Sequence, residues 1–280
     1  MIGKIVKKIS SLLELNKKSN ILFLKSEYDR LVTESKNKDK RILASYGYKV
    51  FSQFDEDGII DEIFKRIGTT NKTFIEFGVG DGTENNTIYL LLQGWKGLWI
   101  EGSQNFVNTI KNNLNNFISQ DKLKIVNKFI TKENINNIIS DNINTKEIDL
   151  LSIDIDGNDS HILSEITCIN PRVIVLEYNA KFGPSLKYCM NYNENYVWKK
   201  SDNFGASLKH FELQLSALGY YCVGCNIAGT NSFFVKKNLV TDELFYSPFT
   251  AENHFRFARY ELIGIPFGHP TINTTFKNFN

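Results

Sequence analysis

The sequence contains no apolar run near the ~20 residues that a membrane-spanning helix requires. Residues 1–20 also lack the long apolar core and the small-residue cleavage site of a secretory signal peptide. We therefore expect a cytoplasmic protein without a transmembrane segment, and peripheral attachment to the inner face of a membrane stays open. The formal net charge is only +2 over 280 residues, so a nucleic-acid partner is not expected.

A complete set of zinc ligands is missing as well. The four cysteines stand at positions 168, 189, 222 and 225, and only Cys222 and Cys225 form a CxxC pair. A redox pair or half of a zinc site would also use this spacing, but a zinc site needs a second pair of Cys or His. Because YYCVGC has the pattern of a strand, we interpret both as free thiols packed in the core, which suits a reducing compartment.

The charges are unevenly distributed along the chain. Residues 1–41 carry eleven Lys/Arg and five Asp/Glu, a net charge of +6, which leaves −4 for the rest. Apolar residues recur at helical spacing between these lysines, and they predict a helical extension over residues 1–45. We favour a cover on the body or a homodimer-forming helix for this extension; a membrane-surface helix is the third possibility.

Strand-like and helix-like stretches alternate after residue 51. This alternation predicts an α/β fold in which helices wrap a mostly parallel sheet. The C-terminal pair of strands, joined by NIAG, predicts an antiparallel hairpin at the sheet edge. We expect one domain over residues 46–240, followed by an irregular aromatic tail, residues 241–280, packed on it. The predicted strands are 73–77, 97–101, 123–129, 148–154, 172–177, 220–225 and 230–236, and the main helices are 52–68, 83–93, 103–117, 132–141 and 159–167.

Three glycines follow the first predicted strand, in FIEFGVGDGTENNT. Gly78, Gly80 and Gly82 stand where an open α/β sheet binds ligands, and glycine lets a ligand approach the backbone. Their spacing is GxGxG, whereas dinucleotide sites read GxGxxG, and Glu76 and Asp81 would repel a pyrophosphate. The loop therefore predicts a ligand with an ammonium or sulfonium charge. A nicotinamide-dependent oxidoreductase is an alternative, and turn glycines beside a surface acid are another.

The stretch from Glu76 to Gly82 resembles motif I of the class I S-adenosylmethionine-dependent methyltransferases. Glu101, at the end of the second strand in GLWIEG, takes the place of the acid that binds ribose in this fold. Further stretches, SQFDEDGII, DLLSIDIDGND, VIVLEYN and GCNIAGTNSFFV, follow in an order similar to that of the FkbM-type methyltransferases, over residues 50–236. This resemblance implies a Rossmann-like class I fold. It also implies O-methylation of a sugar or nucleotide-linked precursor of a bacterial surface polysaccharide, either capsule or O-antigen.

The resemblance assigns candidate roles on the cofactor side. Glu101 would bind the ribose, Phe129 would lie against the adenine, and Asp154 would lie near the amino group. The full set of residues expected at S-adenosylmethionine is Gln53, Glu76, Gly78, Gly80, Asp81, Glu101, Gly102, Ser103, Phe129 and Asp154.

The acceptor side follows the fourth and fifth strands. Asp156 and His161 are candidate catalytic residues, since either could take a proton from an acceptor hydroxyl. Asp156, Glu177 and Asn179 offer the oxygen ligands that Mg²⁺ or Mn²⁺ prefers. The alternatives are that Asp156 belongs to a turn capping the next helix and that His161 is structural. A non-catalytic interaction protein, docked through its basic helix, is a further possibility.

Overall fold

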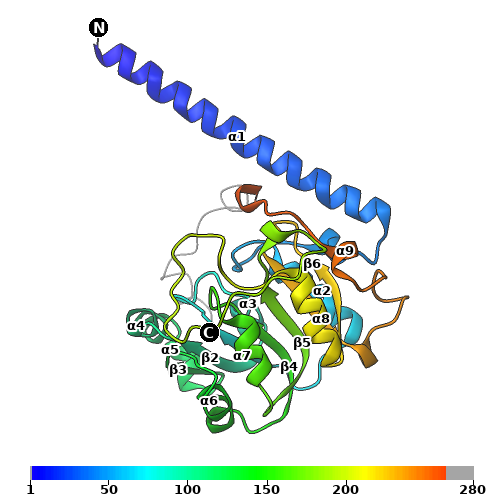
Figure 1. Cartoon of the computed structure of the whole chain (residues 1–280). Coiled ribbons are helices and arrows are strands. Elements are labelled where there is room, and N and C mark those ends of the chain that lie inside the picture. Colours follow the sequence, from blue (N-terminus) through cyan, green and yellow to red (C-terminus); the bar gives the residue numbers. More distant parts are fainter. Residues whose placement is uncertain (1, 263–280) are drawn as a thin grey trace.

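A seven-stranded sheet in the order β3-β2-β1-β4-β5-β7-β6 forms the centre of the protein (Figure 1). The structure is a computed structural model, and it describes residues 2–262. Neighbouring strands from β3 through β5 pair in parallel, whereas β7 is antiparallel to both β5 and β6. The strands are β1 (Thr73–Phe77), β2 (Lys96–Glu101), β3 (Leu123–Asn127), β4 (Glu147–Ile153), β5 (Asn170–Glu177), β6 (Tyr220–Cys225) and β7 (Asn231–Lys236).

Helices cover both faces of the sheet. The first five are α1 (Ile2–Lys38), α2 (Glu56–Ile67), α3 (Ile88–Leu92), α4 (Gln104–Asn113) and α5 (Asn115–Ser119). The others are α6 (Ile135–Asn142), α7 (Asp159–Glu165), α8 (Leu208–Ala217) and α9 (Ala251–His254). Short 3-10 turns complete the described part: η1 (Leu43–Tyr46), η2 (Ala180–Phe182), η3 (Lys237–Leu239) and η4 (Tyr260–Leu262).

Two apolar clusters separate the sheet from its helices. Ile59 and Ile63 of α2 and Leu91 of α3 pack on one face, whereas Ile139 of α6 and Phe211 of α8 pack on the other. The interior strand β1 is buried along its whole length, as a strand covered on both faces must be. The predicted fold class is confirmed: a mostly parallel sheet, a C-terminal antiparallel hairpin and a long N-terminal helix.

Two predicted helices have different bounds in the structure. The helix predicted from residue 83 begins only at Ile88, because the amides of Asn86 and Thr87 bind the Glu76 carboxylate in a preceding loop. The helix predicted over 103–117 breaks at Leu114 into α4 and α5. Residues 78–87, between β1 and α3, therefore form a loop that can shape a binding site.

Helix α1 packs on the body through its C-terminal half only. Tyr28 is buried with Ile42, Phe54 and Ile227, and its hydroxyl donates to the Gly47 carbonyl over 2.9 Å. The described side chains of residues 4–20 are exposed, so the prediction that the extension covers the body is wrong there. None of the described helices has the length and hydropathy needed to cross a bilayer.

The CxxC pair and the first part of the tail lie inside the core. Cys222 and Cys225 are free thiols of β6 and are each 1% exposed, which confirms the interpretation as core thiols. Phe245, from the segment after β7, is fully buried beside α2 and the sheet. The remainder of the predicted tail, residues 263–280, lies outside the described residues.

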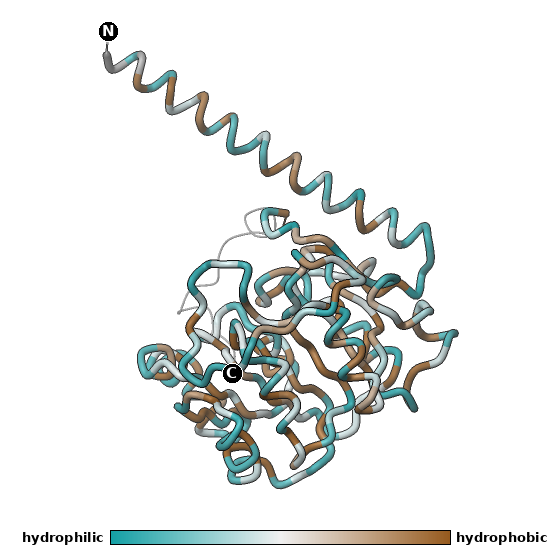
Figure 2. The backbone as a smooth tube through the Cα atoms, viewed as in Figure 1, coloured by the Kyte–Doolittle hydropathy of each residue, from teal (hydrophilic) through white to brown (hydrophobic). Residues whose placement is uncertain are grey.

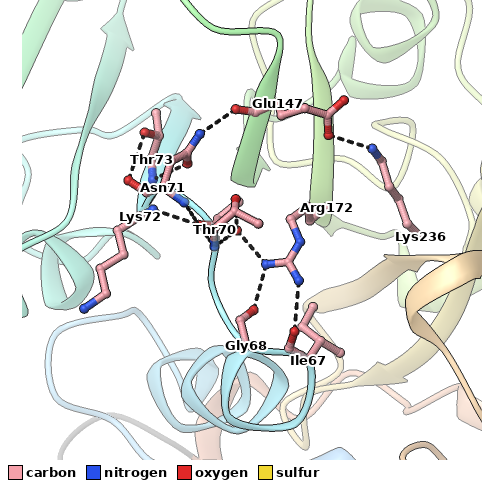
Figure 3. Close-up of polar contacts among 10 residues, drawn as sticks. Ile67, Gly68, Thr70, Asn71, Lys72, Thr73, Glu147, Arg172 and Lys236 are labelled. Carbon is pink, nitrogen blue, oxygen red and sulfur yellow. Dashed lines mark hydrogen bonds and ion pairs between the residues drawn. The ribbon is translucent and has the colours of Figure 1, made fainter.

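One buried carboxylate holds the amino edge of the sheet together. Asp149 of β4 accepts hydrogen bonds from the amides of Thr70 and Lys72 and from the guanidinium of Arg172 at 2.7 Å. Arg172 also donates to the carbonyls of Ile67 and Gly68 at the end of α2 (Figure 3). Burial raises the pKa of Asp149, but these hydrogen bonds outweigh it and hold the pKa below its usual range. This edge is therefore a structural anchor, and it lies opposite the edge at which the carboxyl ends of the parallel strands meet.

Candidate functional site

A cavity of about 680 Å³ opens at the carboxyl ends of the parallel strands. It lies beside β1 and β4, the neighbours between which the strand order reverses, where open α/β sheets bind their ligands. Six of the ten predicted cofactor residues line it: Gln53, Glu76, Gly78, Gly80, Asp81 and Asp154.

The glycine loop after β1 forms one wall of the cavity. Gly78 has a φ of +74°, and a Cβ built there would lie 1.7 Å from the Asp154 carbonyl oxygen. A side chain at this position would therefore push apart the loops that follow β1 and β4. Gly80 also has a positive φ, but a Cβ there would meet no atom within 4 Å, so its backbone faces open space. Gly78 permits the packing of the two loops, and Gly80 permits the approach of a ligand.

Glu76, in strand β1, binds the end of the loop that runs from β1 to α3. Its carboxylate accepts hydrogen bonds from the amides of Asn86 and Thr87, from the Thr87 hydroxyl and from the Ser152 hydroxyl. Burial raises the pKa of Glu76 to about 7, although these hydrogen bonds act in the opposite direction. The side chain borders the cavity, but its oxygen atoms mainly hold the start of α3.

Glu101 joins the end of β2 to the glycine loop. Its two carboxylate oxygens accept hydrogen bonds from the amides of Gly80 at 2.9 Å and Ser103 at 2.8 Å. Ser103 is the N-cap of α4, and Phe129 lies against Gly102 with its ring about half exposed. These four predicted residues, Glu101, Gly102, Ser103 and Phe129, form a ledge next to the cavity and do not line it.

Three carboxylates meet at the other wall of the cavity. Oxygen atoms of Asp154, Asp156 and Glu177 all lie within 4.8 Å of one another. Burial, reinforced by the neighbouring acids, raises the pKa values of Asp154 and Glu177 well above their usual range. Partial burial also raises the pKa of Asp156, the most exposed of the three. Like charges at this separation cannot all ionise cheaply, so a cation placed among them would favour their ionised forms.

Asp156 belongs both to the predicted turn before α7 and to the cluster of three carboxylates. Asp156 has a φ of +58°, and Asn158 is the N-cap position of α7. The Asp159 carboxylate accepts the amides of Ile155 and Gly157 and thereby fixes this turn. Asp159 therefore orders the turn, and the side chain of Asp156 faces the cavity.

The structure does not bring His161 to the cavity. Its Nε2 lies 2.7 Å from the Met190 carbonyl oxygen, and its ring packs against Tyr192 beside a separate surface hollow. Because α7 begins at Asp159, its third residue faces the segment around residue 190 instead of the strand ends.

The side chain of Asn179 also forms its hydrogen bonds outside the carboxylate cluster. Its amide donates hydrogen bonds to the carbonyls of Asp202 and Phe204, and its oxygen accepts the Lys181 amide. The side chain thus ties the segment before α8 to the end of β5. The carboxylate cluster therefore consists of Asp154, Asp156 and Glu177, in place of the predicted set with Asn179.

Two polar residues that sequence reasoning missed line the same cavity. Thr230 and Asn231 are at least 96% buried, and the Thr230 hydroxyl and the Asn231 side-chain oxygen have no hydrogen-bond partner among the described residues. Asn231 pairs with Glu177 across β7 and β5. Buried polar atoms are nearly always paired in native proteins, so unpaired ones beside a cavity are candidates for contact with a ligand or water. The available signal was GTN at the start of the last strand, which has no role in a simple hairpin.

A buried acid at the start of α2 binds the hairpin formed by β6 and β7 and holds it beside the cavity. Glu56, at the start of α2, accepts hydrogen bonds from the side-chain amides of Asn226 and Asn231, each at 2.8 Å. Asn226 in turn accepts the amides of Thr230 and Asn231. The stretches SQFDEDG and GCNIAGTN, about 170 residues apart, therefore form one polar network.

Aromatic side chains line the cavity, and three of them, Phe106, Trp198 and Tyr260, are exposed at its rim. Phe54 and Tyr260 have ring centroids 6.3 Å apart, and Trp198 and Phe204 have centroids 5.8 Å apart. Phe106, in the first turn of α4, adds a fifth ring. These rings give the acidic cavity an apolar entrance, against which the flat face of a ligand ring can pack.

No protein-family model and no curated protein matches the chain. The solved structures to which it is similar include an O-methyltransferase from Bacillus cereus in complex with SAH, at 13% identity and a TM-score of 0.46, covering 76% of this chain and 90% of that one. A putative caffeoyl-CoA O-methyltransferase from Staphylococcus aureus matches at 14% identity and a TM-score of 0.45, covering 81% and 98%. The glycopeptide N-methyltransferase MtfA, complexed with S-adenosylmethionine, matches at 12% identity and a TM-score of 0.41, covering 68% and 96%. These likenesses are distant, and the function proposed for this chain rests on its own residues.

Proposed function

We propose that the chain is an S-adenosylmethionine-dependent O-methyltransferase acting on a sugar or nucleotide-linked precursor of a bacterial surface polysaccharide. The observation that carries this proposal is that the glycine loop and the carboxylates Asp154, Asp156 and Glu177 share one cavity at the switch point of the sheet. This combination suits a cationic cofactor and disfavours a pyrophosphate, which carries negative charge.

The residues present fit S-adenosylmethionine. The open space above Gly80 admits a ligand, and Glu101 keeps a carboxylate beside it to receive ribose hydroxyls. Asp154 and Asp81 border the cavity where an ammonium group would find negative charge. The side-chain nitrogen of Asn85 is buried at the same wall without a partner among the described residues, and it offers one more donor. When bound, the cofactor supplies a methyl group on a positively charged sulfur.

Asp156 is the residue we assign to the acceptor hydroxyl. As the hydroxyl oxygen forms its bond to the methyl carbon, the bond from that carbon to sulfur breaks and the hydroxyl proton must leave. The Asp156 carboxylate faces the cavity, and its raised pKa improves its ability to accept this proton. His161 takes no part in this proposal, because it lies outside the cavity.

A divalent cation would complete the acceptor side. Three carboxylates whose oxygens lie within 4.8 Å, next to the unpaired oxygen of Asn231, offer the hard oxygen ligands that Mg²⁺ or Mn²⁺ prefers. Such a cation would lower the pKa values of all three carboxylates, and it would also lower the pKa of a bound acceptor hydroxyl, so that proton loss would then depend less on the basicity of Asp156.

The rim supports a sugar as the acceptor. Trp198 and Tyr260 present aromatic faces at the entrance, and carboxylate and amide oxygens lie at the base of the cavity. A sugar ring offers apolar C–H groups on its face and hydroxyl donors at its edge, so it complements both parts of this surface.

The test is calorimetric titration of the full chain with S-adenosylhomocysteine, followed by a transfer assay. We expect micromolar binding of S-adenosylhomocysteine and none of NAD⁺. With labelled S-adenosylmethionine and a panel of nucleotide sugars, Asp156→Asn should keep cofactor binding and lose roughly 10²- to 10⁴-fold in transfer rate. Binding of NAD⁺ instead would support the oxidoreductase alternative, and absence of both would support a non-catalytic interaction protein.

A further inference from the structure

The N-terminal half of α1 projects past the body of the protein (Figure 1). On it, Val6, Ile9, Leu12 and Leu13 are between 52% and 59% exposed. Their spacing of three, three and one residues places all four on one face of the helix. The described part of the body leaves this apolar face uncovered, although apolar residues at such helical spacing normally face a core.

The opposite face of the same segment carries lysines and one exposed apolar residue, Leu15. Residues 4–18 contain five lysines against one glutamate, Glu14, a net charge of +4. None of these lysines forms an ion pair with a residue of the described chain. At 100° per residue, Lys4, Lys7 and Lys18 lie on the side away from Ile9. Figure 2 shows the resulting alternation of hydrophobic and hydrophilic residues along the projecting helix.

The C-terminal half of α1 holds the projecting half in place. Tyr28 is 4% exposed and shares an apolar cluster with Leu24, Leu31 and Leu262. Leu262 belongs to η4, the turn that also carries Tyr260 at the rim of the cavity. The projecting helix and the cavity entrance are therefore connected through one short turn.

We propose that residues 4–18 of α1 bind the surface of a membrane that contains anionic lipids. The segment is about 22 Å long, and it can lie in the interface with Val6, Ile9 and Leu13 among the acyl chains. Its lysines then meet lipid phosphates of opposite charge. A second copy of the helix would bring a further charge of +4 to the same place, so charge complementarity selects the lipid surface over self-association. The proposal does not depend on the methyltransferase activity.

Vesicle flotation of the full chain tests this proposal. We compare phosphatidylcholine vesicles with vesicles in which a third of the lipid is phosphatidylglycerol, and we expect binding only to the anionic ones. The double substitution Ile9→Gln and Leu13→Gln should weaken binding by at least about tenfold, because two apolar side chains are removed from the interface. The matched control, Ser11→Gln, introduces the same kind of side chain on the polar face, beside Lys4 and Lys18, and should bind like the wild type.

A charge substitution gives an independent readout. Lys7→Gln and Lys8→Gln should each weaken binding by about fivefold at low salt, and high salt should weaken binding of the wild type. The circular dichroism of every variant should match that of the wild type, because the exposed residues contribute little to folding. Absence of binding to anionic vesicles, or equal binding by the Ile9/Leu13 and Ser11 variants, would overturn the proposal. A wild-type dimer that the Ile9/Leu13 substitutions dissociate, without vesicle binding, would identify a second copy as the occupant.

Discussion

The amide of Gly80 donates a hydrogen bond to the carboxylate of Glu101 over 2.9 Å. This contact makes the acid at the end of β2 and the glycine loop after β1 one structural unit. The second oxygen of Glu101 accepts the Ser103 amide, so the same side chain also positions the start of α4. Glu101 thus orders the ledge on which the ribose and adenine of the proposed cofactor would lie.

Glu101→Gln should weaken the binding of S-adenosylhomocysteine by roughly 10- to 100-fold, as expected for loss of a hydrogen bond to a charged group. Glutamine has one acceptor oxygen, so the amide of either Gly80 or Ser103 loses its partner. Calorimetric titration measures the effect. Glu147→Gln is the matched control, because Glu147 is exposed at the opposite edge of the sheet. An unchanged affinity for Glu101→Gln would remove the ribose assignment.

Mn²⁺ should raise the melting temperature of the wild-type protein, since a ligand that binds only the native state stabilises it. At a concentration about 100 times the dissociation constant, the gain is about 2.7 kcal/mol. Glu177→Gln removes one of the three clustered carboxylates and should abolish most of this gain. Glu243→Gln, on an exposed segment, should keep it. A wild type that Mn²⁺ leaves unchanged would exclude the cation site.

Glu76 should make the protein less stable as the pH rises from about 4.5 to about 7. Burial raises its folded pKa to about 7 from an ordinary value of 4.5, so in this window the folded state holds a proton that the unfolded state releases. Glu76→Gln removes this titration. Denaturant unfolding at a series of pH values should therefore show the wild type losing stability relative to the variant, by on the order of 3 kcal/mol above pH 7. Parallel stability curves would contradict the burial of this charge.

Arg172→Met should destabilise the fold by about 3–5 kcal/mol, because it leaves the Asp149 carboxylate buried without its cation. Urea unfolding measures this loss, and affinity for S-adenosylhomocysteine should change little, since the pair lies at the edge opposite the cavity. Lys236→Met is the control. Lys236 pairs with the exposed side chain of Glu147, so its loss should cost no more than about 1 kcal/mol. A small effect at both positions would mean that the anchor is not essential.

Local patterns were sufficient to predict much of the molecule. The strands 73–77 and 220–225 have the predicted bounds, because short apolar runs between turn residues leave few alternatives. The α/β alternation predicted the parallel sheet, and three of the predicted acids that follow strands, Asp81, Asp154 and Asp156, line the cavity. Strand ends are readable from sequence, since the carboxyl ends of parallel strands meet at one edge of the sheet.

The direction of each side chain beyond the strands was decided by tertiary structure. His161 faces the Met190 segment and Asn179 binds two carbonyls of the chain before α8, because the packing of α7 and of that segment, absent from any local pattern, sets their orientation. Conversely, β7 runs antiparallel and so begins at the carboxyl edge, which brings Asn231 beside Glu177. The sequence by itself determined the sheet, the glycine loop and the acids at the strand ends. Only the fold decided which of these acids gather, because their meeting depends on contacts between residues far apart in the chain.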